Sequence, residues 1–444
     1  MENVKRVFDL LDYNKHGHNS QDILAAKVNG EWVKYSIDDF IRISENVSRG
    51  LISKGIKKND KVAIMSENRP EWNFCDFGIM QMGATQVPMY PTLAENDIKF
   101  ILGNADVKLI FVSTKELYEK IKHAIEACES KGQIYTFERL EGVANWKDLE
   151  KEGETHAEID VEQYKAEITS DDLLTLIYTS GTTGTPKGVM LTHENLLSNI
   201  SASSKLYPEG LKRALSFLPL SHIFERMVVY MYFYLGVSVY YAESLETIVT
   251  NLAEVKPHCF TTVPRLLEKV YDKIVAKGQA LTGIKKKLFF WALDLGHRYE
   301  VDGANGWWYE FQLGIARKLI FKKWQEALGG EIIIIVSGGA ALQERLARVF
   351  WGADIKVLEG YGLTETSPVI AVNGPRTGEV KFGTVGKPLS NVEVKIAEDG
   401  EILCKGPSVM KGYYERPDAT EEAITDGWFH TGDVGNLKHG FLAH

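Results

Sequence analysis

The segment from Tyr178 to Gly188 constrains this chain more than any other. It follows Leu173–Ile177, an apolar run whose composition predicts a buried strand. The segment combines a lysine, hydroxyl-bearing residues, and glycines that can turn backbone N–H groups inward. These residues are Thr179, Ser180, Gly181, Thr182, Thr183, Gly184, Thr185 and Lys187. A strand that opens into such a loop predicts phosphate binding, and the alternative is an ordinary surface turn.

The residue order of this loop argues against a Walker P-loop. That motif places its lysine directly after a glycine and a metal-binding hydroxyl directly after the lysine. Here Pro186 precedes Lys187 and Gly188 follows it. Proline has no N–H to donate to a phosphate, and it restricts Thr185 to extended geometry. We therefore expect a phosphate loop of another kind.

Four further segments strengthen this interpretation. They are Leu218–Arg226, Ser337–Ala340, Glu359–Thr366 and Gly427–Asp433. Together with the loop, and in the same order, they resemble the adenylate-forming (AMP-binding) superfamily of acyl-CoA synthetases, luciferases and adenylation domains of peptide synthetases. One such segment alone would be weak evidence, but five in order are specific. The resemblance covers the chain from about Tyr35 onward.

Bulk properties limit the function classes. The chain has 444 residues, more than one hydrophobic core usually serves, so two or more subdomains are expected. Its net charge of −9 argues against a nucleic-acid partner. The four cysteines lie far apart without a C-x-x-C pair, which predicts free buried thiols in a reducing cytosol. They are Cys75, Cys128, Cys259 and Cys404.

No targeting or membrane-spanning segment is predicted. Met1–Leu11 is charged and lacks an apolar centre, so it does not resemble a signal peptide. The longest nearly apolar run, Met227–Tyr241, is too short to cross a bilayer and is expected to be packed interior. We expect a cytoplasmic protein, with peripheral contact at the inner membrane face left open.

The order of the predicted elements indicates an α/β fold. A strand at 61–65, a helix at 70–82 and a strand at 107–112 form one unit, and 332–336, 343–350 and 356–358 form another. Such alternation predicts parallel sheets covered by helices. We expect one large N-terminal domain over 1–444, with two largely parallel α/β sheet subdomains at about 1–375. Short alternating strands predict a small antiparallel β subdomain at about 376–438.

The resemblance implies roles for individual residues. Tyr361, between two glycines past a predicted strand, would stack on adenine, although a core tyrosine is the alternative. Thr364 and Glu365 would contact the α-phosphate region and Mg²⁺, with Glu365 as the metal ligand; a helix N-terminal cap is their alternative. Asp433 would accept hydrogen bonds from both ribose hydroxyls. His222 would lie near the acyl carboxylate, although a lone histidine is often structural.

The full sets implied by the resemblance are larger. The nucleotide-binding set is Thr179, Ser180, Gly181, Thr182, Thr183, Gly184, Lys187, Gly338, Gly339, Ala340, Glu359, Gly360, Tyr361, Gly362, Thr364 and Asp433. The catalytic set is Lys187, His222, Thr364 and Glu365. The backbone of Ser337–Ala340 would line the adenine and acyl pocket.

The resemblance also implies a reaction. A carboxylate attacks the α-phosphorus of ATP, which releases pyrophosphate and leaves an acyl-adenylate; the thiol of CoA then displaces AMP. Leu218–Arg226, Val263–Tyr271 and the helical segment 281–328 look like the long-chain fatty acyl-CoA synthetase branch, so fatty acid, ATP, CoA and Mg²⁺ are the expected substrates and cofactors. Some bacterial members have a tryptophan gate near the position of Arg226, and that gating is not carried over.

The end of the chain also bears on activity. In the family, a hinge and a mobile C-terminal domain with a catalytic lysine follow the segment Gly427–Asp433. This chain ends at Gly440–His444, before that hinge. We therefore expect weak ATP binding, severely reduced adenylation and essentially no thioester formation, because lid closure completes such sites.

Residues 281–324 differ from the rest of the chain. They carry eight basic and four acidic residues, with aromatic side chains between them. Such helices suit anionic membrane surfaces, and the alternative is a surface helix pair whose aromatic residues face the core. Other functions remain open: activation of another acid for a carrier protein, a non-catalytic nucleotide or fatty-acid sensor, or a membrane scaffold. A homodimer also remains open.

Overall fold

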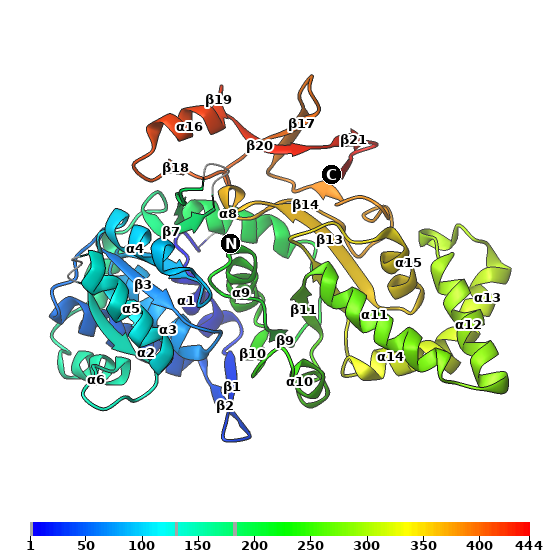
Figure 1. Cartoon of the computed structure of the whole chain (residues 1–444), viewed down its shortest axis with the longest axis horizontal. Helices are drawn as coiled ribbons and strands as arrows, with labels where there is room; N and C mark the ends of the chain where they lie inside the picture. Colours follow the sequence, from blue (N-terminus) through cyan, green and yellow to red (C-terminus); the bar gives the residue numbers. More distant parts are fainter. Residues whose placement is uncertain (1–2, 129–131, 181–183) are drawn as a thin grey trace.

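Two large β-sheets with helices on their faces form the body of the molecule, and a smaller β layer lies along one side (Figure 1). The computed structural model describes residues 3–128, 132–180 and 184–444. The predicted α/β class, with two largely parallel sheets and a small antiparallel one, is confirmed. Within the described residues, no helix is long and apolar enough to cross a membrane.

The first sheet has seven strands in the order β18-β8-β7-β4-β3-β5-β6. The strands from β7 to β6 are parallel, whereas β8 and β18 are antiparallel additions at one edge. Their bounds are β3 Lys61–Met65, β4 Thr85–Met89, β5 Val107–Val112, β6 Gln133–Thr136, β7 Leu173–Thr179, β8 Lys187–Thr192 and β18 Gly412–Tyr413. The strands predicted at 61–65, 107–112 and 173–177 are confirmed.

The second sheet has nine strands in the order β15-β14-β13-β12-β11-β9-β10-β1-β2. The six strands from β13 to β1 are parallel, and both edges are antiparallel. Their bounds are β1 Leu24–Val28, β2 Glu31–Tyr35, β9 Arg213–Ser216, β10 Ser238–Tyr241, β11 Cys259–Thr262, β12 Ile334–Ser337, β13 Lys356–Gly362, β14 Val369–Val372 and β15 Lys387–Pro388. The strand predicted at 332–336 begins two residues later than expected.

The β layer contains a four-stranded antiparallel sheet, β16-β17-β20-β19, and the hairpin β21-β22. Their bounds are β16 Glu393–Ile396, β17 Glu401–Lys405, β19 Ile424–Thr425, β20 Trp428–Val434, β21 Asn436–Lys438 and β22 Phe441–Ala443. Two strands of this part of the chain join the large sheets instead: β15 extends the nine-stranded sheet and β18 extends the seven-stranded one. The late residues thus tie both sheets together.

Helices cover the sheets and fill the space between them. Their bounds are α1 Asp9–Gly17, α2 Ile37–Ser53, α3 Pro70–Gln81, α4 Glu95–Asn104, α5 Lys115–Cys128, α6 Trp146–Thr155, α7 Val161–Ala166, α8 His193–Ser204, α9 Ile223–Leu235, α10 Ile248–Val255, α11 Pro264–Gln279, α12 Gly283–His297, α13 Trp307–Ala316, α14 Lys322–Ala327, α15 Glu344–Gly352 and α16 Pro417–Ala423. Short 3₁₀ turns lie at Val301–Gly303 and Thr364–Thr366, and a π-helical turn at Arg317–Phe321.

Local sequence explains where the central helices begin and end. A capping box between Thr192 and Asn195 begins α8, because each side chain satisfies a free backbone N–H of the other. Gly236 adopts φ 69° and ends α9 with a left-handed cap. The run 227–241 spans the end of α9, the link Gly236–Val237 and β10, and most of its side chains are buried, which confirms the predicted packed interior.

A fully buried charge network joins α9 to α3. The Arg226 guanidinium lies 2.5 Å from the Asp76 carboxylate and donates to Tyr230 Oη at 2.6 Å and Thr175 Oγ1 at 2.7 Å. Tyr230 in turn donates to the second oxygen of Asp76. Because every charge has a partner, the network can remain inside the core. Arg226 therefore has a structural role in the core.

Candidate active site

Tyr361 and Asp433 meet although 72 residues separate them in sequence. Tyr361 lies near the end of β13, and its hydroxyl donates to Asp433 Oδ2 in β20 at 2.7 Å. Burial raises the pKa of Tyr361, which keeps the phenol protonated and able to donate. The carboxyl end of a parallel strand is the usual place for a nucleotide in such sheets. The residues implied for adenine and ribose are therefore neighbours.

The face of the Tyr361 ring is covered by the last residue of the chain. The His444 imidazole stacks on Tyr361 with ring centroids 4.7 Å apart and planes 25° from parallel. Its Nε2 also lies 3.7 Å from Asp433 Oδ1. A flat heteroaromatic ring therefore lies on the predicted adenine platform, next to the predicted ribose carboxylate.

Glycine is required beside this tyrosine. A Cβ on Gly362 would collide with the carbonyl oxygen of Pro368, and one on Gly360 would lie 3.3 Å from Val372. The β13–β14 pairing is also irregular between Tyr361 and Gly362. The missing side chain of Gly362 thus allows the close approach of the Pro368 backbone, directly before the 3₁₀ turn that carries Thr364 and Glu365.

A second cluster joins Glu365, Tyr413 and Lys187. The Tyr413 hydroxyl donates to Glu365 Oε1 at 2.9 Å, and the Lys187 ammonium lies 5.1 Å from the centre of the Tyr413 ring. A backbone hydrogen bond also holds Glu365 beside the segment that leads into β18, because Met410 N donates to the Glu365 carbonyl at 2.7 Å. Among the described residues, Lys187 has no carboxylate partner. A cation over the ring face and an anion at the ring hydroxyl therefore share one tyrosine, each with capacity for a further ligand.

The phosphate loop predicted from the sequence is only partly described. Thr179 and Lys187 are paired across the β7–β8 ladder, so the two ends of the loop that joins these strands are adjacent. Gly184 has φ 83°, as expected of a glycine that turns the backbone. Ser180 is exposed. Gly181, Thr182 and Thr183 lie outside the described residues.

The loop after β12 is held by Glu359. The Glu359 carboxylate is buried and accepts a hydrogen bond from Leu342 N at 2.8 Å. Burial raises its pKa to about 7, with the hydrogen bond opposing that rise. Gly338 is buried, whereas Gly339 and Ala340 are exposed at the sheet edge. Glu359 thus acts on the predicted pocket by positioning its backbone.

His222 caps the helix that leads into this region. Its Nδ1 accepts from Phe224 N at 3.1 Å, so the ring is the α9 N-cap. Surrounding protein lowers its pKa although one side of the ring is exposed, which favours the neutral form that can accept this bond. A Cβ on Gly338 would lie 3.1 Å from the Phe224 ring. The end of β12 and the start of α9 are therefore adjacent.

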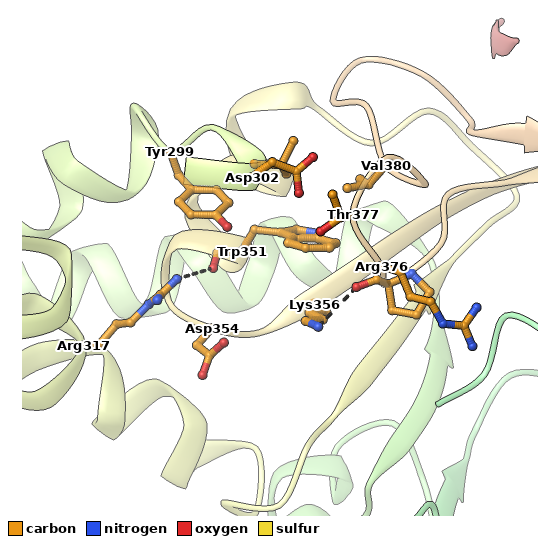
Figure 2. A pocket seen from close by; sticks show the side chains of 11 residues that line it. Tyr299, Asp302, Arg317, Trp351, Asp354, Lys356, Arg376, Thr377 and Val380 are labelled. Carbon is orange, nitrogen blue, oxygen red and sulfur yellow. Dashed lines mark hydrogen bonds between the residues drawn. The ribbon is translucent and has the colours of Figure 1, made fainter. Parts of the chain in front are cut away.

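A separate pocket lies away from these residues. It is a cavity of about 180 Å³ lined by Tyr299, Val301, Asp302, Arg317, Trp351, Asp354, Lys356, Pro375, Arg376, Thr377 and Val380 (Figure 2). Lys356 begins β13, whereas Tyr361 lies near its other end, about 17 Å along the strand. Arg317 and Lys356 already donate to backbone carbonyls at this pocket. It is therefore distinct from the candidate active site.

Comparison with known proteins agrees with this geometry. Residues 14–414 match the family described as AMP-binding enzyme. This chain belongs to that family. Among curated relatives of this AMP-binding enzyme, the long-chain-fatty-acid–CoA ligase FadD15 of Mycobacterium bovis is 34% identical over 427 residues, covering 94% of this chain and 70% of the relative. Long chain acyl-CoA synthetase 3 of Arabidopsis thaliana is 33% identical, covering 92% of this chain and 65% of the relative.

Solved structures support the fold. The N-terminal domain of FACL13 from Mycobacterium tuberculosis superimposes with a TM-score of 0.74 at 20% identity, with 99% of each chain covered. A complex of VinN with L-aspartate gives a TM-score of 0.75 at 21% identity, also with 99% of each chain covered. The fold of this AMP-binding enzyme is thus that of acyl-CoA synthetase N-terminal domains.

Sequence reasoning missed Tyr413. It lies outside every segment that carried the family resemblance, and its neighbour Tyr414 is also a tyrosine, so nothing local separates the two. Its contact with Glu365 spans 48 residues and exists because β18 pairs with β8. A short antiparallel edge strand of two residues carries too weak a periodic signal to be placed in advance.

Proposed function

We propose that this AMP-binding enzyme activates a long-chain fatty acid with ATP and transfers the acyl group to CoA. The observation that carries the chemistry is the convergence of Tyr361 and Asp433 with the Glu365–Tyr413–Lys187 cluster at the carboxyl edges of the two sheets. The acid class rests on the likeness to long-chain-fatty-acid–CoA ligases over most of the chain.

The residues divide the work by their chemistry. Tyr361 offers a flat ring for adenine, and Asp433 offers a carboxylate for the ribose hydroxyls. Lys187 offers positive charge beside the β7–β8 loop, where phosphates would lie. In this arrangement the protein accelerates the attack of the fatty carboxylate on the α-phosphorus by positioning and charge neutralisation, without a covalent nucleophile on the enzyme.

We propose Glu365 as the ligand for Mg²⁺. Magnesium in such sites is typically held by one or two carboxylates and the substrate phosphates, and it supplies charge neutralisation. Among the described residues, no cluster of three or more His, Cys, Asp or Glu side chains could hold a metal alone. Glu365 has one oxygen bonded by Tyr413, which fixes the carboxylate while its other oxygen can bind a cation. The donor set therefore fits a metal that arrives with ATP.

A pyrophosphate-exchange assay with fatty acids of increasing length tests this proposal. In the natural full-length protein, palmitate should stimulate exchange of labelled pyrophosphate into ATP, and addition of CoA should yield palmitoyl-CoA by mass spectrometry; the 444-residue chain should show weak exchange and essentially no palmitoyl-CoA. Exchange without acyl-CoA, but with acyl transfer to a carrier protein, would assign the second candidate function. Calorimetric binding of MgATP without any exchange would indicate a non-catalytic relative. If the protein neither binds MgATP nor catalyses exchange with any acid tested, the site assignment is contradicted.

A further inference from the structure

Helix α8 begins where β8 ends and carries two buried amide side chains on one side. Asn195 and Asn199 lie four residues apart, so they leave the helix from successive turns on the same face. Asn195 is 8% exposed and Asn199 is fully buried. In Figure 1 this helix lies between the two large sheets and next to the β layer. Buried amides are retained where hydrogen bonds satisfy them, so their partners show what they hold in place.

Asn199 holds the turn that carries Glu365. Its Nδ2 donates to the carbonyl of Val369 at 2.8 Å and to that of Thr366 at 3.4 Å. Its Oδ1 accepts from Val369 N at 3.4 Å. Thr366 ends the 3₁₀ turn of Glu365, and Val369 begins β14. One side chain on α8 thus fixes the backbone that follows the proposed metal ligand.

Asn195 holds the segment that leads to Tyr413. Its Nδ2 donates to the carbonyl of Pro407 at 2.8 Å and to that of Val409 at 3.0 Å. The residue after Val409 donates its backbone N–H to the Glu365 carbonyl at 2.7 Å. The two amides of α8 therefore bond to the two chain segments that meet at the Glu365–Tyr413 hydrogen bond.

We propose that Asn195 and Asn199 are positioning residues of the metal site, which hold Glu365 and Tyr413 in contact through the backbone. The proposal rests on the proposed role of Glu365 as the Mg²⁺ ligand. A three-residue turn and a two-residue strand have few backbone bonds of their own, so a rigid helix that bonds both can set their separation. Because α8 follows β8 directly, it also connects this pair to Lys187, the first residue of β8.

Calorimetric titration of the natural full-length protein with ATP, with and without Mg²⁺, tests this positioning. Asn195→Asp keeps the oxygen that accepts from Thr192 N, so the capping of α8 is preserved, but it loses both donors to the 407–409 backbone. Asn199→Ala removes the other connection without adding charge. Either variant should weaken MgATP binding about fivefold and change the binding of metal-free ATP less than about twofold. If Asn199→Ala does not fold, Asn195→Asp decides the test, because its side chain lies nearer the surface.

A double variant separates positioning from a general loss of structure. If Asn195 acts by placing the Tyr413 hydroxyl, little remains for it to place once that hydroxyl is removed. Asn195→Asp should therefore weaken MgATP binding less than about twofold when it is combined with Tyr413→Phe. Additive losses in the double variant would overturn the proposal.

Two amides elsewhere in the fold provide matched controls. Asn145→Asp also keeps a helix cap while it loses bonds to the backbone carbonyls of 136–138. Asn14→Ala removes a fully buried amide that donates to the Phe233 carbonyl. Both controls should bind MgATP like the parent.

The remaining outcomes are equally decisive. Equal weakening in the controls, equal weakening with and without Mg²⁺, or unchanged binding in both α8 variants would overturn the proposal. A parent protein that does not bind MgATP would overturn it as well. A parent that binds MgATP but catalyses no pyrophosphate exchange would refute the ligase reaction, and the binding comparison would still decide the role of the two amides.

Discussion

Two clusters in this molecule contain the same three kinds of side chain, an acid, a base and a tyrosine, in opposite settings. In the core, Asp76, Arg226 and Tyr230 are fully buried and bonded to one another at every charged group. At the active site, Tyr413 bonds to Glu365, but Lys187 touches only the ring face. In the core cluster the charged groups are paired with one another, whereas at the active site the Lys187 ammonium and one oxygen of Glu365 can still bind a ligand.

This difference separates stability from function. A buried ion pair that loses one partner strands a charge in low dielectric, so its members should control folding. A half-exposed pair is screened by water and contributes little to stability, so its members should control binding and catalysis. Substitutions in the two clusters should therefore change different measurements.

Arg226→Met should have the largest effect. The substitution leaves Asp76 buried without its guanidinium, which should cost about 3–5 kcal/mol of unfolding free energy. Urea unfolding followed by circular dichroism measures this. The double variant Arg226→Met, Asp76→Leu should recover much of the loss, because no charge then remains buried. An Arg226→Met protein as stable as the parent would mean that the buried cluster does not control folding stability.

Glu365→Gln should leave folding intact and damage catalysis. We expect the pyrophosphate-exchange rate to fall about a hundredfold, because charge at a phosphoryl site acts directly on the transition state. The Mg²⁺ concentration for half-maximal rate should rise, while the melting temperature should stay near that of the parent. Glu393→Gln, at an exposed position in the β layer, is the control. A large loss of stability with an unchanged exchange rate would mean that Glu365 has a structural role, like Asp76 in the core cluster.

Glu359 lies between these two extremes, because it is buried and no basic side chain of the described residues pairs with it. Its pKa is raised to about 7 from an ordinary 4.5, so the folded state binds more protons than the unfolded state between these values. The unfolding free energy should therefore fall as pH rises. Relative to Glu359→Gln, the parent should lose about 2 kcal/mol between pH 5 and pH 8. Parallel stability curves for the two proteins would contradict this.

Tyr413→Phe should have the smallest effect, and a neighbouring tyrosine provides a closely matched control. It removes only the hydroxyl that fixes Glu365, and keeps the ring beside Lys187. A bond to a charged group of this kind should cost about tenfold in the exchange rate. Tyr414→Phe is the matched control, because its ring lies under Lys61 instead. The Mg²⁺ dependence should shift for the first variant only; equal behaviour of both would remove Tyr413 from the site.

Much of this architecture could be predicted from local sequence. β3 and β5 are short apolar runs of strand length, and α3 begins with Pro70 in its first turn. The two parallel sheets follow from the alternation of predicted strands and helices along the sequence. The meeting of Tyr361 with Asp433 was implied by family resemblance rather than by local pattern. Contacts across long stretches of sequence carry no periodic signal, so the β18 edge and its Tyr413 could not be placed.

Burial was equally hard to predict. The aromatic residues of 281–324 looked alike in sequence, yet Tyr309 is buried and Trp307 is almost fully exposed. Which face of a helix is covered depends on its neighbours, here α12, and the few polar side chains of α13, such as Glu310 and Gln312, mark the solvent side poorly. The contact of the Glu359 carboxylate with the backbone N–H of Leu342, 17 residues away, likewise has no local sequence signal.

The strands at the two sheet edges determine the order in which the molecule can be completed as it is synthesised. The hairpin β1–β2 appears first but must wait for β10. The edge strand β18 joins β8 only after β15, the last strand of the other sheet, has been made. Each sheet therefore receives its last strand only after most of the chain has been synthesised. Both keep an open edge until late, a condition that slows folding and favours mispairing with other chains.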